Sequence, residues 1–272
     1  MARHGSVEVT IPKILSALPA NWRDQIASKA LSPIASGMSG AQVFRVSGDG
    51  EDDQYLKFGT DDNAIHLRNE IERTEWLGSM GVRVPKTIMR FDKPNVSVWL
   101  MTSLGSYTVE DARAENWKVT VSTIAHAFAA IHSLPAENCP FDETRNVRLH
   151  RALSLVQQGK IDPTQFDARN AGLTSHDIYR RLESAVPIQE DIVVVHGDAT
   201  LSNLVVGRDG SIGFVDCGTS GRADRYVDLS LLIDQMQAKF GAEAKNVFIS
   251  KYMQMDWDRS KADFYRDLYE LF

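Results

Sequence analysis

The chain has 272 residues, of which 43% are hydrophobic and 24% charged. This is the composition of an ordinary globular protein, and the length fits one large domain or two unequal lobes. Its formal net charge is -6, whereas nucleic-acid binders usually carry a basic excess, so no nucleic-acid partner is expected. The acidic balance by itself fits either simple solubility or a site for a cationic substrate.

Targeting and redox signals favour the cytoplasm. The two cysteines, Cys139 and Cys217, are too few for a disulfide framework or for a zinc site of their own, and they suit a reducing compartment. Residues 1–12 contain no apolar core of a secretory signal. No apolar run approaches the roughly 18 to 20 residues that span a bilayer. We therefore expect a cytoplasmic protein without a membrane partner. The sequence leaves both a monomer and a weak dimer open.

Residues 31–100 favour strands and one helix. Two short strands, Ala41–Val46 and Gln54–Gly59, flank a polar turn. Asp61 and Asp62 then supply capping chemistry for a helix. Val96–Met101 is a further strand, after an extended stretch. This order predicts a β-hairpin, a helix and further strands.

The apolar spacing becomes helical from about residue 108. A core-facing stripe steps by three and four from Trp117 to Ile131. Further helices are predicted over Arg148–Gln158, Ser175–Ala185, Tyr226–Phe240 and Trp257–Leu271. We therefore expect an α+β chain in two lobes. Residues 1–102 form an antiparallel sheet with one helix, 103–107 a hinge, and 108–272 a mostly helical lobe.

Four polar side chains follow short apolar strands in the second half. The apolar run Ile192–Val195 is followed by His196 and Asp198, and Asn203 comes five residues after Asp198. A hairpin around Gly207–Gly210 then returns the chain to Asp216. Two carboxylates and one amide oxygen can therefore converge. Asp216 and Asn203 suit Mg²⁺, which prefers hard oxygen ligands, and Asp198 can accept the proton of an attacking hydroxyl.

These residues resemble the eukaryotic-like kinase superfamily, and most of all the aminoglycoside 3′-phosphotransferases. The segments that carry the resemblance are Val195–Asn203, Gly213–Gly218 and Gly221–Asp228, with His132–Pro135, Cys139–Asp142 and Phe264–Phe272. The resemblance implies a bilobal protein-kinase-like fold that uses ATP and Mg²⁺. It also implies that Asp228 and His196 support the catalytic loop structurally.

The resemblance further implies where ATP binds. Lys57 is similar to the strand lysine that contacts the α- and β-phosphates, and Glu70 to its ion-pair partner on the following helix. The small residues Ser39 and Gly40 lie in a segment similar to the loop that covers the phosphates; it is not a Walker A sequence. The segment Met101–Leu104 resembles the hinge, where backbone groups of Thr102 and Leu104 would hold adenine.

An aminoglycoside carries several ammonium groups, so the acceptor site needs carboxylates near Asp198. The positions that match the family are Asp167, Glu270 and the Phe272 terminus, with Asp162 as a further candidate. Several positions depart from the family pattern. Acids are frequent at four of them, which here are Ala168, Ala238, Lys239 and Tyr269, and an arginine is common where Thr219 stands. These departures concern the range of drugs rather than phosphoryl transfer.

The leading hypothesis is ATP-dependent phosphorylation of the 3′-hydroxyl of kanamycin- or neomycin-type drugs, which would confer resistance. A related small-molecule kinase acting on choline, a sugar amine or a macrolide is the alternative. A nucleotide-binding pseudokinase is a third hypothesis, which the complete set of phosphate and metal residues disfavours. A protein kinase is disfavoured because no A-P-E element follows Asp216.

Overall fold

A computed structural model describes residues 11–27, 29–34, 40–48, 53–105, 107–253 and 256–272. The chain divides into two compact units. Unit 1 comprises Met1–Ser79 and Val84–Leu104, and unit 2 comprises Met80–Arg83 and Gly105–Phe272. No helix among the described residues is long and apolar enough to cross a membrane.

Unit 1 is built on a five-stranded antiparallel sheet. The strands are β1 (Ala30–Ile34), β2 (Gln42–Ser47), β3 (Gln54–Thr60), β4 (Thr87–Lys93) and β5 (Val96–Thr102), in the order β1-β2-β3-β5-β4. Helix α3 (Asp62–Ser79) covers one face, where Leu67 and Ile71 pack with Trp99. The predicted hairpin, helix and strands are therefore confirmed.

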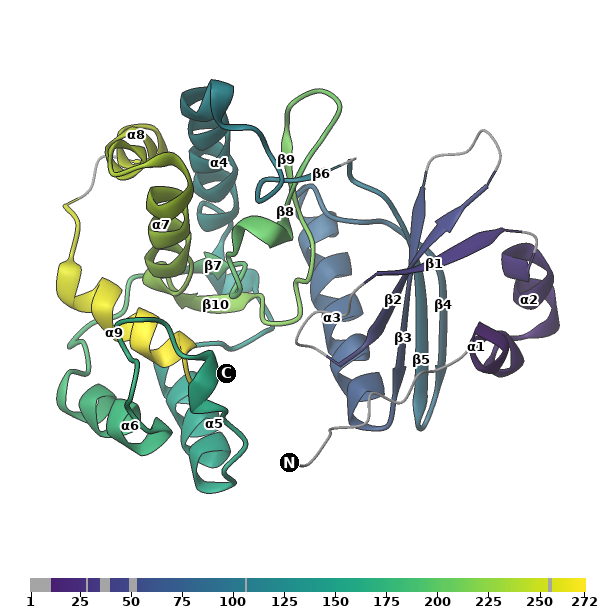
Figure 1. Cartoon of the computed structure of the whole chain (residues 1–272), viewed down its shortest axis with the longest axis horizontal. Coiled ribbons are helices and arrows are strands. Elements are labelled where there is room, and N and C mark those ends of the chain that lie inside the picture. The colour runs from purple at the N-terminus through teal and green to yellow at the C-terminus, as the bar shows by residue number, and fades with distance from the viewer. Residues whose placement is uncertain (1–10, 28, 35–39, 49–52, 106, 254–255) are drawn as a thin grey trace. The chain divides into compact units, whose positions relative to one another are not determined.

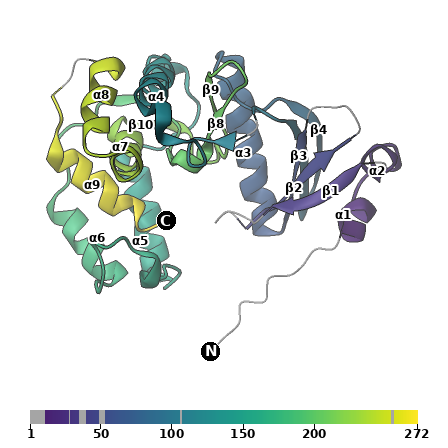
Figure 2. The same ribbon diagram turned by 45° about the horizontal axis from the view of Figure 1, so that its top comes forward.

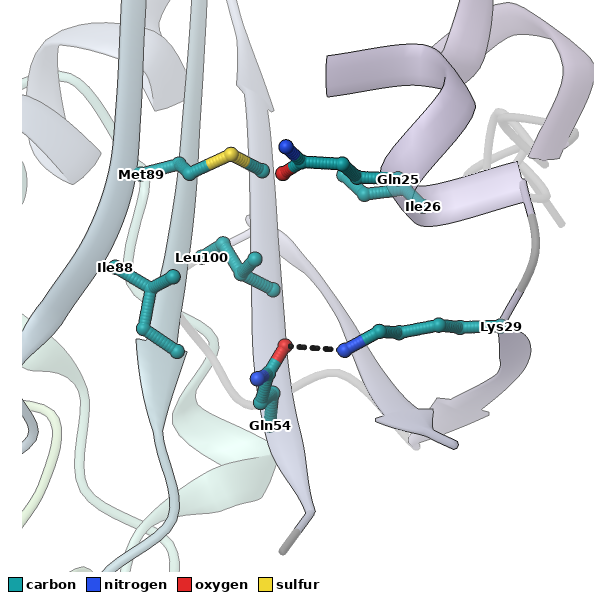
Figure 3. Close-up of a pocket in the computed structure, with 7 residues that line it drawn as sticks. All are labelled: Gln25, Ile26, Lys29, Gln54, Ile88, Met89 and Leu100. Carbon is teal, nitrogen blue, oxygen red and sulfur yellow. Dashed lines mark hydrogen bonds between the residues drawn. The ribbon is translucent and has the colours of Figure 1, made fainter. Parts of the chain in front are cut away.

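Two short helices that the sequence did not reveal cover the other face of this sheet (Figure 1). They are α1 (Ile11–Ala17) and α2 (Ala20–Ala27), and they bury Ile14 and Ile26 against Phe44 and Leu56. A pocket lies where α2 meets β3, β4 and β5, and there Lys29 Nζ donates to Gln54 Oε1 at 3.3 Å (Figure 3). None of the predicted site residues lines this pocket.

Unit 2 is mostly helical. Its helices are α4 (Trp117–His132), α5 (Arg145–Gln157), α6 (Ser175–Ser184), α7 (Tyr226–Phe240), α8 (Glu243–Tyr252) and α9 (Arg259–Tyr269). Helix α9 packs against α5, α6 and α7, as both views show (Figures 1 and 2). Its buried side chains Phe264, Tyr265 and Leu268 join one core with Ile178 and Val195.

Short strands of unit 2 carry its polar loops. They are β6 (Tyr107–Thr108), β7 (Ile192–Val195), β8 (Leu204–Val206), β9 (Ile212–Phe214) and β10 (Gly221–Asp224). Strand β7 pairs with β10, and β8 lies between β6 and β9. The predicted hairpin is thus β8–β9, and the predicted α+β class is confirmed.

Candidate active site

The loop after β7 is shaped by a glycine. Gly197 has φ +91°, and a Cβ there would lie 2.1 Å from the backbone oxygen of Thr219. Only glycine adopts this conformation at low cost and allows so close a backbone approach. The buried strand therefore ends in a tight turn that presents Asp198 beyond it.

Asn203 is anchored to Asp198. Its Nδ2 donates to the backbone oxygen of Asp198 at 3.0 Å and to the Asp198 Oδ2 at 2.9 Å. The amide nitrogen is thus committed to Asp198, which leaves the Oδ1 of Asn203 as the end that can act as an oxygen ligand. The five-residue spacing read from the sequence is bridged by these two bonds.

The β8–β9 hairpin brings Asp216 to the same place. The Val215 N–H donates to the Asn203 backbone oxygen at 3.0 Å, so Asp216 follows a residue that is paired with Asn203. Asp216 itself has φ 58°, which is uncommon for a residue other than glycine and often marks a functional position. One carboxylate and one amide oxygen are the hard donors that Mg²⁺ prefers.

The described part of the chain provides few protein ligands for a metal ion. Among the described residues, no group of three or more His, Cys, Asp or Glu side chains is placed to hold one. A cation at Asn203 and Asp216 would therefore complete its shell with water and substrate phosphates. Mg²⁺ usually binds in this way, so the donor set fits it.

Asp228 binds the backbone of the loop that carries Asp198. It is fully buried and accepts from the His196 and Gly197 N–H groups, both at 2.8 Å, while His132 Nε2 lies 3.0 Å from its Oδ2. Burial opposes its charge, but these hydrogen bonds and the neighbouring histidines hold the pKa of Asp228 below its ordinary value. His196 Nε2 also lies 2.8 Å from the Val215 oxygen, which ties the loop to the hairpin.

Unit 1 contains a buried ion pair. Lys57 Nζ on β3 lies 2.5 Å from Glu70 Oε1 on α3, and the two side chains are only 5% and 8% exposed. A buried charge is tolerated only with such a partner. The pair that the sequence suggested is therefore formed, and the lysine ammonium is held in one place.

The structure describes three of the four other residues predicted to contact the nucleotide. Ser39 lies outside the described residues, whereas Gly40 has φ +68° and its oxygen accepts from Asn63 Nδ2 at 3.1 Å. The Thr102 N–H donates to the Lys86 oxygen at 3.0 Å, so it is engaged within the sheet region. Leu104 is the last residue of unit 1. Their contacts with adenine stay predictions.

The carboxylates predicted for the acceptor lie within a network of charges. Glu270 accepts from the Asp167 N–H at 3.1 Å, and Arg266 pairs with the Asp167 carboxylate at 3.0 Å and with Asp234. Burial opposes the Asp167 charge, but the Asn170 N–H and Arg266 hold its pKa below the usual value. Burial raises the pKa of Glu270.

The remaining acceptor candidates have structural partners. Asp162 caps a short 3₁₀ helix by accepting from the Thr164 N–H at 2.9 Å. The Phe272 ring lies over the guanidinium groups of Arg148 and Arg151, at 5.9 and 6.0 Å. A contact of either residue with a substrate stays a prediction.

Sequence reasoning missed one contact of Asp198. The Tyr269 hydroxyl donates to Asp198 Oδ1 at 3.0 Å. Burial, followed by the Asp198 charge, raises the pKa of Tyr269, so the phenol stays protonated. The signal in the sequence was that Tyr269 departs from the expected family pattern, in which an acid is frequent there, and this gave no hint of its partner.

Comparison with known proteins identifies the family of the chain. Residues 30–265 match the family described as the phosphotransferase enzyme family. An Escherichia coli aminoglycoside 3′-phosphotransferase is 30% identical over 87% of this chain and 88% of its own length. Among solved structures, an aminoglycoside 3′-phosphotransferase of type VIII superposes with TM-score 0.85 and 26% identity, over 99% of this chain and 100% of that one. A Streptomyces rimosus aminoglycoside phosphotransferase of the 3″ type, solved with ADP and streptomycin, gives TM-score 0.81 and 25% identity, over 94% and 98%.

Proposed function

This chain belongs to the phosphotransferase enzyme family, and from that premise we propose that it transfers the γ-phosphoryl group of ATP to the 3′-hydroxyl of an aminoglycoside of the kanamycin or neomycin type. The transfer would add negative charge to the drug and remove a hydroxyl donor, and it would thereby confer resistance. Such a reaction would take place in the cytoplasm, where ATP is available.

The observation that carries the proposal is the arrangement around Asp198. Its carboxylate follows a buried strand and accepts a hydrogen bond from Asn203. The β8–β9 hairpin brings Asp216 next to Asn203, because Val215 pairs with the Asn203 backbone. Phosphoryl transfer needs mainly positioning and neutralisation of charge, which this set supplies. Relatives that are named aminoglycoside 3′-phosphotransferases support the choice of acceptor.

Each residue then has a distinct task. Asp198 orients the acceptor hydroxyl and takes its proton as the oxygen attacks the γ-phosphorus. Asn203 and Asp216 would hold Mg²⁺, which when bound neutralises charge on the phosphates. Lys57, fixed by Glu70, would contact the α- and β-phosphates, and Ser39 and Gly40 would cover them. Asp228 and His196 would keep the loop in shape.

The remaining assignments rest on the resemblance to the family. Residues 1–102 would bind ATP, with 103–107 as the hinge and 108–272 as the catalytic and acceptor lobe. Thr102 and Leu104 would hold adenine. Asp167, Glu270, Asp162 and the terminal carboxylate of Phe272 would receive ammonium groups of the acceptor.

A second acceptor position has specific support. The relative solved with streptomycin is a phosphotransferase of the 3″ type and covers nearly the whole chain. Streptomycin phosphorylated at its 3″-hydroxyl is therefore the competing product. A kinase for choline, a sugar amine or a macrolide is the more distant alternative.

A coupled assay of ADP release separates these cases. Kanamycin should be turned over, whereas tobramycin, which lacks the 3′-hydroxyl, should not. Equal turnover of both drugs would contradict the 3′ assignment, and turnover of streptomycin alone would favour the 3″ product. Asp198→Ala should reduce turnover by about 10²- to 10⁴-fold while nucleotide binding persists. A loss of both would indicate a structural role for Asp198.

A further inference from the structure

The proposed base Asp198 is already hydrogen bonded on both carboxylate oxygens. Oδ2 accepts from Asn203 Nδ2 at 2.9 Å and Oδ1 accepts from the Tyr269 hydroxyl at 3.0 Å. The first bond is local, five residues along the chain, and belongs to the catalytic loop. The second comes from α9, 71 residues away, and the function proposed above does not require it.

The Tyr269 bond is of the kind that an acceptor has to make. An alcohol that is about to be phosphorylated must donate its O–H to the carboxylate of the base. The phenol makes such an O–H to carboxylate bond with Asp198. Asn203 already donates to Oδ2, so Oδ1 is the oxygen that would accept the hydrogen bond of an incoming hydroxyl. The Tyr269 phenol donates to this oxygen.

The phenol belongs to the last residue of a well-anchored helix. Tyr269 is the last residue of α9, whose neighbouring side chains Tyr265 and Leu268 are buried in the core, whereas Tyr269 itself is only partly buried. The backbone before it is thus anchored, and the side chain reaches from the end of the helix to Asp198. A side chain in this position can give up one hydrogen bond without disturbing the helix.

We propose that the Tyr269 hydroxyl occupies the acceptor position at Asp198 until a substrate hydroxyl displaces it, and that it thereby keeps water from serving as the acceptor. The inference rests on the phosphotransferase function proposed above. It makes Tyr269 a specificity-determining residue, since water is the competitor that every kinase has to exclude. The acceptor that displaces the phenol must supply other contacts, such as ammonium groups on Asp167 and Glu270, that repay the lost bond.

Removal of the phenol oxygen would admit water. In Tyr269→Phe the ring stays but the oxygen is gone, and the vacated space beside Asp198 Oδ1 is about that of one water molecule, which would find a strong acceptor there. The water oxygen would attack the γ-phosphorus of ATP, and its proton would pass to Asp198. The bond from the γ-phosphorus to the β,γ-bridging oxygen would break, giving ADP and inorganic phosphate.

The test measures release of inorganic phosphate from ATP and Mg²⁺ without any acceptor. Tyr269→Phe should raise this rate several-fold over the unsubstituted chain and should lower the KM for the aminoglycoside, because the drug no longer competes with the phenol. Tyr265→Phe is the matched control. It removes a phenol from the same helix whose oxygen, among the described residues, bonds only Glu190, at 3.5 Å, and it should change neither quantity.

Two outcomes would overturn the inference. If Tyr269→Phe leaves hydrolysis unchanged and lowers kcat with the same KM, the phenol positions Asp198 and the inference is wrong. Hydrolysis that persists when Asp198→Ala is added would arise elsewhere and would also overturn it. Thermal melting of each variant verifies the fold. Turnover of drugs by the unsubstituted chain tests the proposed function separately, so failure of one idea can be told from failure of the other.

Discussion

At the scale of single residues, buried charges are held by specific partners. Glu70 fixes Lys57 in unit 1, while Asp228 collects two backbone N–H groups and His132 beneath the catalytic loop. A buried charge without its partner is costly, so each of these sites should respond strongly to loss of one member. We expect disruption at Lys57, the proposed phosphate contact, to weaken ATP binding, and disruption at Asp228 to lower the stability of the fold.

Replacement of Glu70 by Gln should raise the KM for ATP by about tenfold, because a charge-assisted bond worth roughly 1.5–3 kcal/mol no longer holds Lys57 toward the phosphates. The KM for the acceptor should change much less. Steady-state kinetics with each substrate varied in turn measures this. Glu72→Gln is the matched control, since Glu72 lies on the same helix with its side chain 56% exposed. An equal effect from both variants would contradict the role of the pair.

Replacement of Asp228 by Asn should destabilise the fold by about 3–5 kcal/mol, the usual cost of breaking a buried charged set. The folded-state pKa of Asp228 is depressed, so its ionised form stabilises the native state above the unfolded pKa of about 4. That contribution disappears as the pH falls through the lower folded pKa. Urea titrations at pH 7 and at pH 3 should therefore show a difference between the two proteins that shrinks in acid. A difference independent of pH would contradict the assignment.

At the scale of elements, the turn after β7 sets the position of Asp198 by steric demand. Gly197→Ala combines a left-handed backbone, which costs about 1–2 kcal/mol for other residues, with a Cβ 2.1 Å from the Thr219 oxygen. The clash should add about 1–3 kcal/mol and displace the loop, with a large loss of kcat. Gly159→Ala provides the control, because Gly159 has φ +62° but nothing within 4 Å of a Cβ. Thermal melting and turnover of both variants check this, and equal losses would mean that backbone strain alone matters.

Elements with a strong local pattern could be predicted from the sequence. The helix Tyr226–Phe240 is found with its predicted bounds, and the β8–β9 hairpin lies where the flanked Gly207–Gly210 turn indicated it. Strand β10 was missed because Gly221–Asp224 has little preference for strands and exists through pairing with β7, a distant partner. Helix α8 was missed although Ala244, Phe248 and Tyr252 step by four along its buried side.

The contacts of the candidate site are likewise of two kinds: local ones, which the sequence predicts, and contacts between residues far apart in sequence, which it does not. The approach of Asp198, Asn203 and Asp216 followed from their spacing and a hairpin, both of which are local. The bond from Tyr269 to Asp198 joins residues 71 apart, and no spacing rule links them. The pairing of Asp167 with Arg266 has the same origin. Contacts between remote elements are decided by how the helices pack, which the periodicity of one helix does not determine.

At the scale of the whole molecule, the net charge of -6 should act on a polycationic acceptor before any contact forms. An acidic protein attracts cations over distances near the Debye length, about 10 Å at 0.1 M salt. For an aminoglycoside, kcat/KM should therefore fall several-fold when the ionic strength is raised from 0.02 M to about 0.5 M, mainly through KM. The kcat/KM for ATP, an anion, should not fall in parallel. Stopped assays at matched Mg²⁺ with NaCl and with potassium acetate separate screening from specific ion effects. An acceptor kcat/KM that is independent of salt would mean that recognition depends on uncharged contacts, and it would favour an acceptor with fewer ammonium groups than kanamycin.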